Sequence, residues 1–198
     1  MKTTALVATL LLIACAGAST PRTHYLLRTD VPEQTLRVDP PVRVGLRKLV
    51  VAPYLDQPGL VVETEPRQVR PARHHLWAEP LDEGLRRVLR AEISKALGYD
   101  VSSDAAEAGQ WDYSVDVRVE RLHGDMSGRA LLVASWRIAR GPGAKPAAAF
   151  RFARSAALPR EGYAGLVEAQ IDLARQLSLA IAGSLGEVGG SALGADPP

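Results

Sequence analysis

The hydrophobic positions along the chain change period several times, and each period predicts one kind of element. Alternating or β-branched stretches predict strands at residues 24–29, 42–55, 60–64, 111–121, 129–140 and 148–156, with a short extended piece at 75–77. Apolar residues at helical spacing predict a helix from Pro80 to Leu97, ended by Gly98, and a second helix from about Tyr163 to Leu185. Residues 67–72 and 123–125 carry loop or turn signals.

The stretch 111–120 has the most regular alternation of the chain. Its odd-numbered positions, from Trp111 to Val119, are aromatic or valine, and its even-numbered positions are Asp, Ser, Arg and Glu. One buried and one solvated face are typical of an antiparallel or mixed sheet. The order of strands, helix, three strands and helix predicts an α/β fold of the α+β type. This is a two-layer sandwich in which two amphipathic helices cover one face of a mixed sheet of about five strands.

The N-terminus has the features of an export signal. Met1 and Lys2 precede an uncharged, mostly apolar run over residues 3–14. A membrane span needs roughly 20 such residues, so the run has the length of a signal-peptide core instead. It ends in Leu12-Ile-Ala-Cys15, which resembles a bacterial lipobox. That resemblance implies that the thiol of Cys15 is alkylated by diacylglycerol and that cleavage before it leaves an acylated N-terminus. An ordinary secretory signal with an incidental cysteine is the alternative.

These features predict a domain organisation and a location. Residues 1–14 are a lipoprotein signal peptide, 15–23 the lipidated N-terminus and tether, 24–185 a single α/β domain and 186–198 a flexible tail. Ala16, rather than Asp, follows the lipobox cysteine and favours the outer membrane, with the domain on its periplasmic face. The eight residues of tether reach at most ~26–29 Å, so the domain stays close to the lipid surface.

Composition excludes several classes of protein. The 198 residues carry a net charge of +2, which gives nucleic acid no preference as a partner. Apolar residues make up 46% of the chain, enough for the core of one domain. Cys15 is the only cysteine, so neither an intrachain disulfide nor a cysteine metal site is available. A chain without further thiols suits an oxidising compartment such as the periplasm.

The motifs of common enzymes fail on their spacing. The segment 141–145 contains glycines and a lysine but not the P-loop spacing, and 183–186 lacks the spacing of a nucleophile elbow. His74 and His75 are adjacent on an extended segment, so their side chains point to opposite faces and do not chelate one ion together. Asp112 and Asp116 share a face but lie ~13 Å apart along a strand, too far for a glycosidase pair. The sequence predicts no catalytic residue, no metal site and no cofactor.

A basic run remains as the candidate binding feature. Arg67, Arg70 and Arg73 lie in a predicted loop, which is either simply solvated or meets lipid head groups or an acidic partner. Trp77 follows at the start of the first helix, where it either plugs the core or belongs to an interface. These four residues form the predicted partner interface.

Several stretches together resemble a known family. They are the lipobox, Tyr25-Leu-Leu27, Val42-Arg-Val-Gly-Leu46, Val50-Val-Ala-Pro-Tyr-Leu-Asp56 and His75-Leu-Trp-Ala-Glu-Pro-Leu81. This pattern resembles the auxiliary lipoprotein family of ABC-type transport systems. The resemblance implies an α/β sandwich and a non-enzymatic role in moving lipids between membranes, with the MCE-domain tunnel protein of the same system as partner. We expect a homo-oligomer, since symmetric self-association matches a ring-shaped partner. A structural lipoprotein of another envelope assembly and a periplasmic hydrolase with an unrecognised site remain the alternatives.

Overall fold

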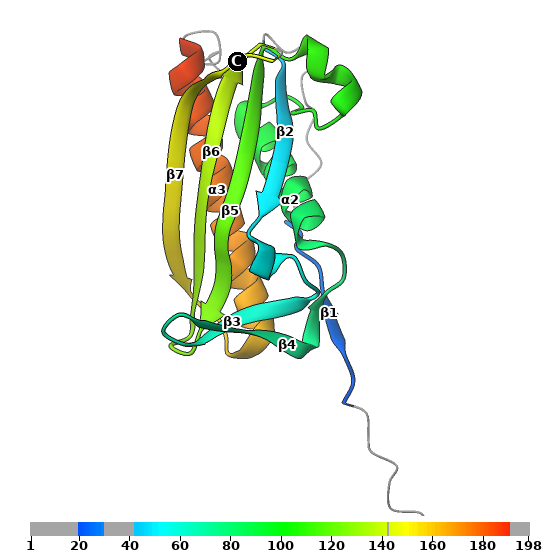
Figure 1. Ribbon diagram of the computed structural model, residues 1–198, viewed down its shortest axis with the longest axis vertical. Helices are drawn as coiled ribbons and strands as arrows, with labels where there is room; N and C mark the ends of the chain where they lie inside the picture. The colour runs from blue at the N-terminus through cyan, green and yellow to red at the C-terminus, as the bar shows by residue number, and fades with distance from the viewer. Residues whose placement is uncertain (1–19, 30–41, 142, 191–198) are drawn as a thin grey trace, which may run out of the picture.

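The computed structural model describes residues 20–29, 42–141 and 143–190. Within them, seven strands form one mixed sheet, and α2 and α3 cover one of its faces (Figure 1). The predicted α/β class is confirmed, with seven strands instead of about five. Cys15 and the predicted signal peptide lie outside the described residues, as does most of the predicted tail. The elements are β1 (Thr23–Tyr25), β2 (Val44–Val51), a 3-10 helix (Pro53–Leu55), β3 (Gly59–Glu65), β4 (Gln68–Trp77), α2 (Leu81–Leu97), a 3-10 helix (Ala105–Gln110), β5 (Tyr113–Asp125), β6 (Arg129–Arg140), β7 (Pro146–Ala157) and α3 (Gly162–Gly189).

The central strand of the sheet is β5. One of its edges pairs antiparallel with β6, which in turn pairs with the edge strand β7. Its other edge is shared: β2 runs parallel to residues 113–119, and β3 pairs only with Gly124 and Asp125. The β3–β4 hairpin therefore lies across one end of the long strands, with β1 on its outer side (Figure 1). We call this the hairpin end, and the opposite end, which holds the β6–β7 turn, the far end.

A bulge in β5 explains a wrong turn prediction. Val119 pairs with Ala134 and Arg121 with Val133, so Glu120 is an extra residue in the strand. After the bulge the next side chain that faces the core is Leu122, three residues beyond Val119 instead of two. The alternation of buried and exposed residues is therefore interrupted in the sequence. The segment 123–125 was therefore expected to turn, whereas it completes β5, and the turn follows at residues 126–128.

The predicted loop at 67–72 is also wrong, because most of it belongs to β4. The chain turns at Arg67, the only described residue other than glycine with a positive φ, 71°. From Gln68 onward the chain pairs with β3. Proline fits at position 71 because β1 pairs only with residues 75–77, which leaves that part of β4 an open edge.

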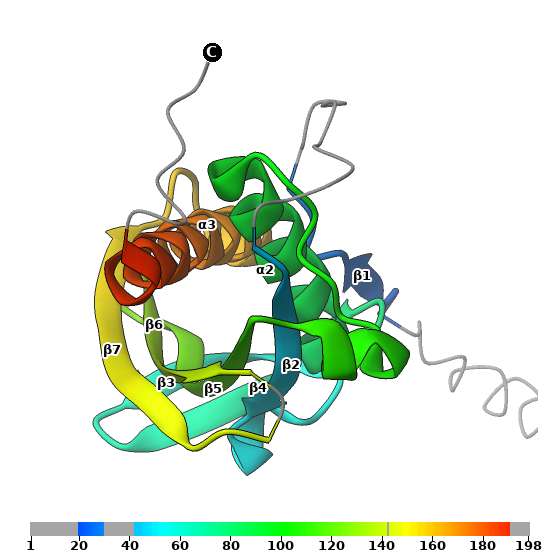
Figure 2. The ribbon, with the colours of Figure 1, turned by 90° about the horizontal axis from the view of Figure 1, so that it is seen from above.

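The helices pack into the hollow of a strongly curved sheet. Figure 2 shows the sheet curling from β7 to β2 around the side occupied by α2 and α3. Leu85 and Leu89 of α2 and Leu173 and Leu177 of α3 are fully buried there. Trp111, predicted to face the core with Tyr113, instead lies before the strand and covers Gly45 of β2, where an added Cβ would be 2.0 Å from the indole ring.

The helix boundaries differ slightly from prediction. Pro80 caps α2 rather than starting it, and Gly98 ends it in the left-handed conformation, as its sequence position indicates. The second helix continues to Gly189, four residues beyond the predicted Leu185. Near that end the side chain of Arg140 in β6 donates to the carbonyl oxygen of Val188 and ties α3 to the sheet.

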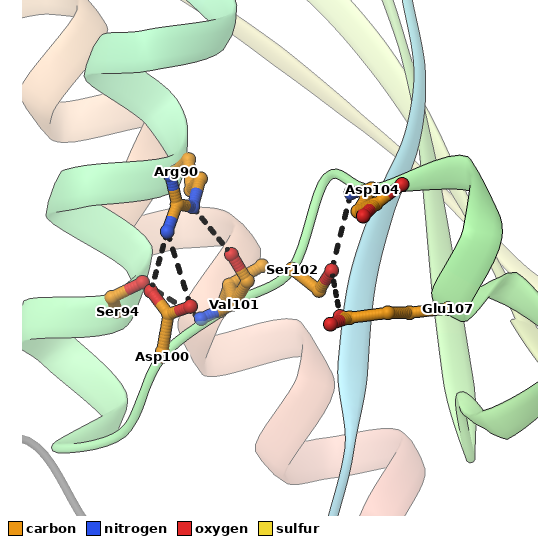
Figure 3. A network of polar contacts seen from close by, with 7 residues as sticks. All are labelled: Arg90, Ser94, Asp100, Val101, Ser102, Asp104 and Glu107. Carbon is orange, nitrogen blue, oxygen red and sulfur yellow. Dashed lines mark hydrogen bonds and ion pairs between the residues drawn. The ribbon is translucent and has the colours of Figure 1, made fainter.

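Polar side chains fix the connection between α2 and β5 (Figure 3). Arg90 on α2 donates to the carbonyl oxygen of Val101 at 2.8 Å and forms an ion pair with Asp100. The hydroxyl of Ser94 accepts the Val101 N–H at 2.9 Å. Ser102 forms an isolated β-bridge with Gly45, so these bonds also fix the connection against the edge of β2 that faces away from β5.

The buried stripe of α2 gives a direct test of its packing. Replacing Leu89 by Ala leaves a cavity in the core, and we expect the free energy of unfolding to fall by ~2–5 kcal/mol. Arg87 lies on the exposed face and pairs with Glu79, so Arg87→Ala should cost at most ~1 kcal/mol. Urea titrations of both variants measure the difference, and equal losses would contradict the assigned face.

Tyr99, in the same connection, gives a pH test. Its buried hydroxyl has no hydrogen-bond partner among the described residues. Burial, and secondarily Asp112, raises the pKa of Tyr99 to about 12. The folded protein therefore holds this proton more tightly than the unfolded chain. The resulting stability is fully present below pH ~10 and is lost as pH rises through about 12.

We therefore expect Tyr99→Phe to leave stability at pH 7 equal or higher and to reduce the loss of stability between pH 9 and pH 12. Thermal unfolding followed across this range measures both effects, with Tyr25→Phe as a control whose hydroxyl is bonded to His75. A marked destabilisation at pH 7 would show that the Tyr99 hydroxyl has a partner in solution.

Candidate interaction surfaces

The three predicted interface arginines lie together on the β3–β4 hairpin. Arg67 occupies the turn, and Arg70 and Arg73 are exposed on β4. The backbone N–H of Arg67 donates to the Glu63 carboxylate at 2.9 Å, which fixes the turn and leaves the guanidinium outside it. The ion pairs formed by the described residues involve none of the three guanidinium groups.

Trp77, the fourth predicted residue, lies elsewhere. It ends β4, is only 8% exposed and packs in the hydrophobic core. Of the two roles considered for it, the packing role fits this position, because the folded chain leaves little of the indole for a partner to touch.

The two histidines between these residues point to opposite sides of β4. His75 stacks on Tyr163 at the start of α3, with ring centroids 4.0 Å apart, and its Nδ1 lies 3.0 Å from the Tyr25 hydroxyl. This aromatic cluster joins β1, β4 and α3. The Nδ1 atom of His74 is buried and has no hydrogen-bond partner in the part of the chain that the structure describes.

A groove of about 660 Å³ opens beside the hairpin. Its apolar walls come from Val62, Leu158, Tyr163 and Leu166, and Met126 stands at its rim. Met126 forms the tip of the β5–β6 turn and is 73% exposed. Asp125 organises this turn: hydrogen bonds from Ser127 and from the Arg129 N–H outweigh burial and lower the pKa of Asp125.

The solvent face of the sheet is charged, and its carboxylates are occupied. Asp112 accepts the backbone N–H of Arg43 at 2.8 Å, and Asp116 forms a two-pronged pair with Arg47 across the bulge of β2. Lys48, Arg118 and Arg137 line a shallow hollow of about 290 Å³ beside that pair. The arrangement matches the solvated strand face expected from the sequence.

One buried polar cluster was not visible in the sequence. His123, 4% exposed, lies 3.9 Å from the Glu63 carboxylate and beside the ring of Tyr54, 6.4 Å between centroids. Burial raises the pKa of Tyr54. The three side chains come from β5, β3 and the 3-10 helix after β2. They meet because β2 and β3 both pair with β5. The cluster joins these elements beneath the hairpin.

Within residues 20–29, 42–141 and 143–190, no group of three His, Cys, Asp or Glu side chains is placed to hold a metal ion. No described helix has the length and apolar character required to cross a membrane. Sequence reasoning missed Met126 and the groove, because their residues come from β3, the β5–β6 turn and α3. The exposed methionine between Asp125 and Ser127 was the one local signal available.

Comparison with known proteins agrees with this architecture. The Escherichia coli protein named "Intermembrane transport lipoprotein PqiC" is 26% identical over 132 residues, which are 66% of this chain and 70% of that protein. A crystal structure of an uncharacterized protein superposes with a TM-score of 0.71 at 24% identity and covers 84% of this chain and 99% of its own. Protein XCC0632 from Xanthomonas campestris has a TM-score of 0.66 at 18% identity, with 85% and 98% covered.

The two solved structures establish a shared fold. A more direct assignment comes from the family described as the ABC-type transport auxiliary lipoprotein component, which matches residues 25–182. The match runs from β1 to α3 and takes in the hairpin, the central strand and both helices. The chain therefore belongs to the ABC-type transport auxiliary lipoprotein family.

Proposed function

We propose that this protein is a lipid-anchored, non-catalytic subunit of an ABC-type lipid transport system. Acylated Cys15 holds it on the periplasmic face of the outer membrane, where it docks to the MCE-domain tunnel protein of the same system. The observation that carries the proposal is the family match across residues 25–182. The printed name of the Escherichia coli relative, an intermembrane transport lipoprotein, supports the transport role.

The chemistry of the surface supports docking rather than catalysis. The carboxylates of Asp112 and Asp116, the pair that most resembled an acid/base site, accept hydrogen bonds from Arg43 and Arg47. A general acid or base needs a free proton position facing a substrate, whereas one Asp112 oxygen and both Asp116 oxygens accept hydrogen bonds from the chain itself. The hollow of about 290 Å³ on the solvent face of the sheet is lined mainly by charged and polar side chains, unlike the mostly apolar walls of a typical small-molecule site.

Self-association has a specific candidate surface in β7. Among the described residues this strand of twelve pairs only with β6, so the backbone groups of its other edge are available to a second chain. Phe152 of β7 and Leu179 of α3 line a hollow of about 450 Å³ along that edge, and Leu179 is 54% exposed. An unpaired edge beside an apolar side chain suits a symmetric contact between copies.

Lipidation is tested by Cys15→Ser. The variant should leave the membrane fraction, because a single non-covalent surface contact holds a protein on lipid far more weakly than acyl chains do. Fractionation of cells that express wild type and variant at equal levels measures the change, and the mass of the wild-type N-terminal peptide reports the acyl groups. A variant that remains with the outer membrane like wild type would refute the anchor.

Self-association is tested at Leu179. Leu179→Asp places a charge in the proposed contact and should convert the purified protein from oligomer to monomer in light scattering. Ala96→Asp introduces the same charge at an exposed position of α2 and should leave the oligomer intact. Capture of the proposed MCE-domain partner should weaken with the first variant only. A wild-type monomer that captures no MCE protein and hydrolyses a lipid or peptidoglycan would favour the hydrolase alternative.

A further inference from the structure

We propose that the hairpin end of the domain binds the membrane directly. In this proposal Arg67, Arg70 and Arg73 bind the head groups of anionic phospholipids, and Met126 enters the apolar layer below them. The proposal rests on the lipid anchor of the proposed function. The sequence left lipid head groups and an acidic partner open for the three arginines, and the proposal assigns them to lipid.

The position of the tether points to this end. The described chain begins at Thr20, and the segment that leads into β1 lies toward the lower end of the molecule in Figure 1. Thr23 of β1 pairs with His75 of β4, two residues beyond Arg73. The remaining length to Cys15 spans at most ~26–29 Å when fully extended and less when relaxed. The lipid attached at Cys15 therefore keeps β4 near the membrane surface whichever way the tether bends.

The charge of the hairpin is suited to an anionic surface. Arg67, Arg70 and Arg73 project from one open-edged strand and a turn, without carboxylate partners among the described residues. The same hairpin carries Glu63 and Glu65, which accept hydrogen bonds from the neutral Arg67 N–H and the Gln68 amide and keep their charges, so its arginines exceed its carboxylates by one. By contrast, Arg160, on the loop before α3, pairs with Glu168 and does not add to the free charge.

An apolar tip stands beside these charges. Met126 has the largest exposed fraction among the exposed large apolar side chains of the described chain, and Val69, at 42% exposed, lies between the arginines on β4. The pairing of Val62 with Gly124 places the β5–β6 turn next to the hairpin. An unbranched, flexible thioether adapts to a fluid environment at low cost. Basic residues around an exposed apolar tip are typical of proteins that lie on anionic bilayers.

The test uses the whole acylated protein on vesicles. A fluorophore is attached at Met126→Cys or, as the matched control, at Ala144→Cys in the β6–β7 turn of the far end. The acylated Cys15 thiol does not react, so each protein carries one label. Vesicles contain phosphatidylcholine with or without phosphatidylglycerol, together with lipids that bear a quencher in the acyl chain. We expect quenching at 126, stronger with phosphatidylglycerol, and none at 144.

A charge series identifies the cause. Each basic residue near an anionic surface strengthens binding about fivefold, so Gln at Arg67, Arg70 and Arg73 should shift the docked equilibrium by about 100-fold and remove the effect of phosphatidylglycerol. Gln at Lys48, Arg118 and Arg137 removes the same charge from the solvent face of the sheet and should change nothing.

The outcomes separate this proposal from the one on which it rests. A protein whose mass shows no acyl group refutes the anchor. An acylated protein with equal quenching at 126 and 144 refutes the membrane contact and returns the arginines to a protein partner. Quenching at 126 that persists unchanged when the three arginines are replaced also overturns the proposal. That result would show that the arginines do not bind the lipid head groups.

Discussion

The architecture depends on how one long strand, β5, divides its edge between two partners. Its first half pairs with β2 and its last two residues with β3, and the bulge at Glu120 lies between these stretches. A bulge increases the local twist, so the strand bends where its neighbour changes. The bend sends the β3–β4 hairpin across the end of the sheet and encloses His123 and Leu122 beneath it. Without this exchange of partners the sheet would have no hairpin end.

Burial follows the same division. The long strands and both helices share one core, in which Leu46, Leu89 and Leu173 are fully buried. The hairpin is attached by different means: two pairs to β5, the stack of His75 on Tyr163, and the buried Trp77 where β4 meets α2. Its turn and much of β4 remain exposed, including Val69 and Arg70. A well-packed body therefore presents a thin, charged and partly apolar end.

Sequence reasoning worked where one element has one buried face. The bounds of β6 were predicted to the residue because Gly128 and Gly141 flank it, and α2 was predicted to within one residue because its helical spacing is uninterrupted. It failed at β4, whose open edge tolerates Pro71 and arginines, and at the end of β5, where the bulge breaks the alternation. The hairpin end combines residues from Thr23 to Tyr163, so no local pattern contains it. Arginines were recognised as a feature but not as part of a strand.

The length of α3 sets the distance between the hairpin end and the far end of the domain. The helix begins beside His75 and ends where Arg140 binds the Val188 carbonyl oxygen, and its 28 residues rise about 42 Å. It thus acts as a rigid spacer between the two ends. If the hairpin end lies on lipid as proposed, with α3 upright on the bilayer, the far end would stand about 40 Å from the membrane surface. A tunnel protein received there would stop short of the bilayer, and subunits arranged side by side would have to enclose the remaining gap.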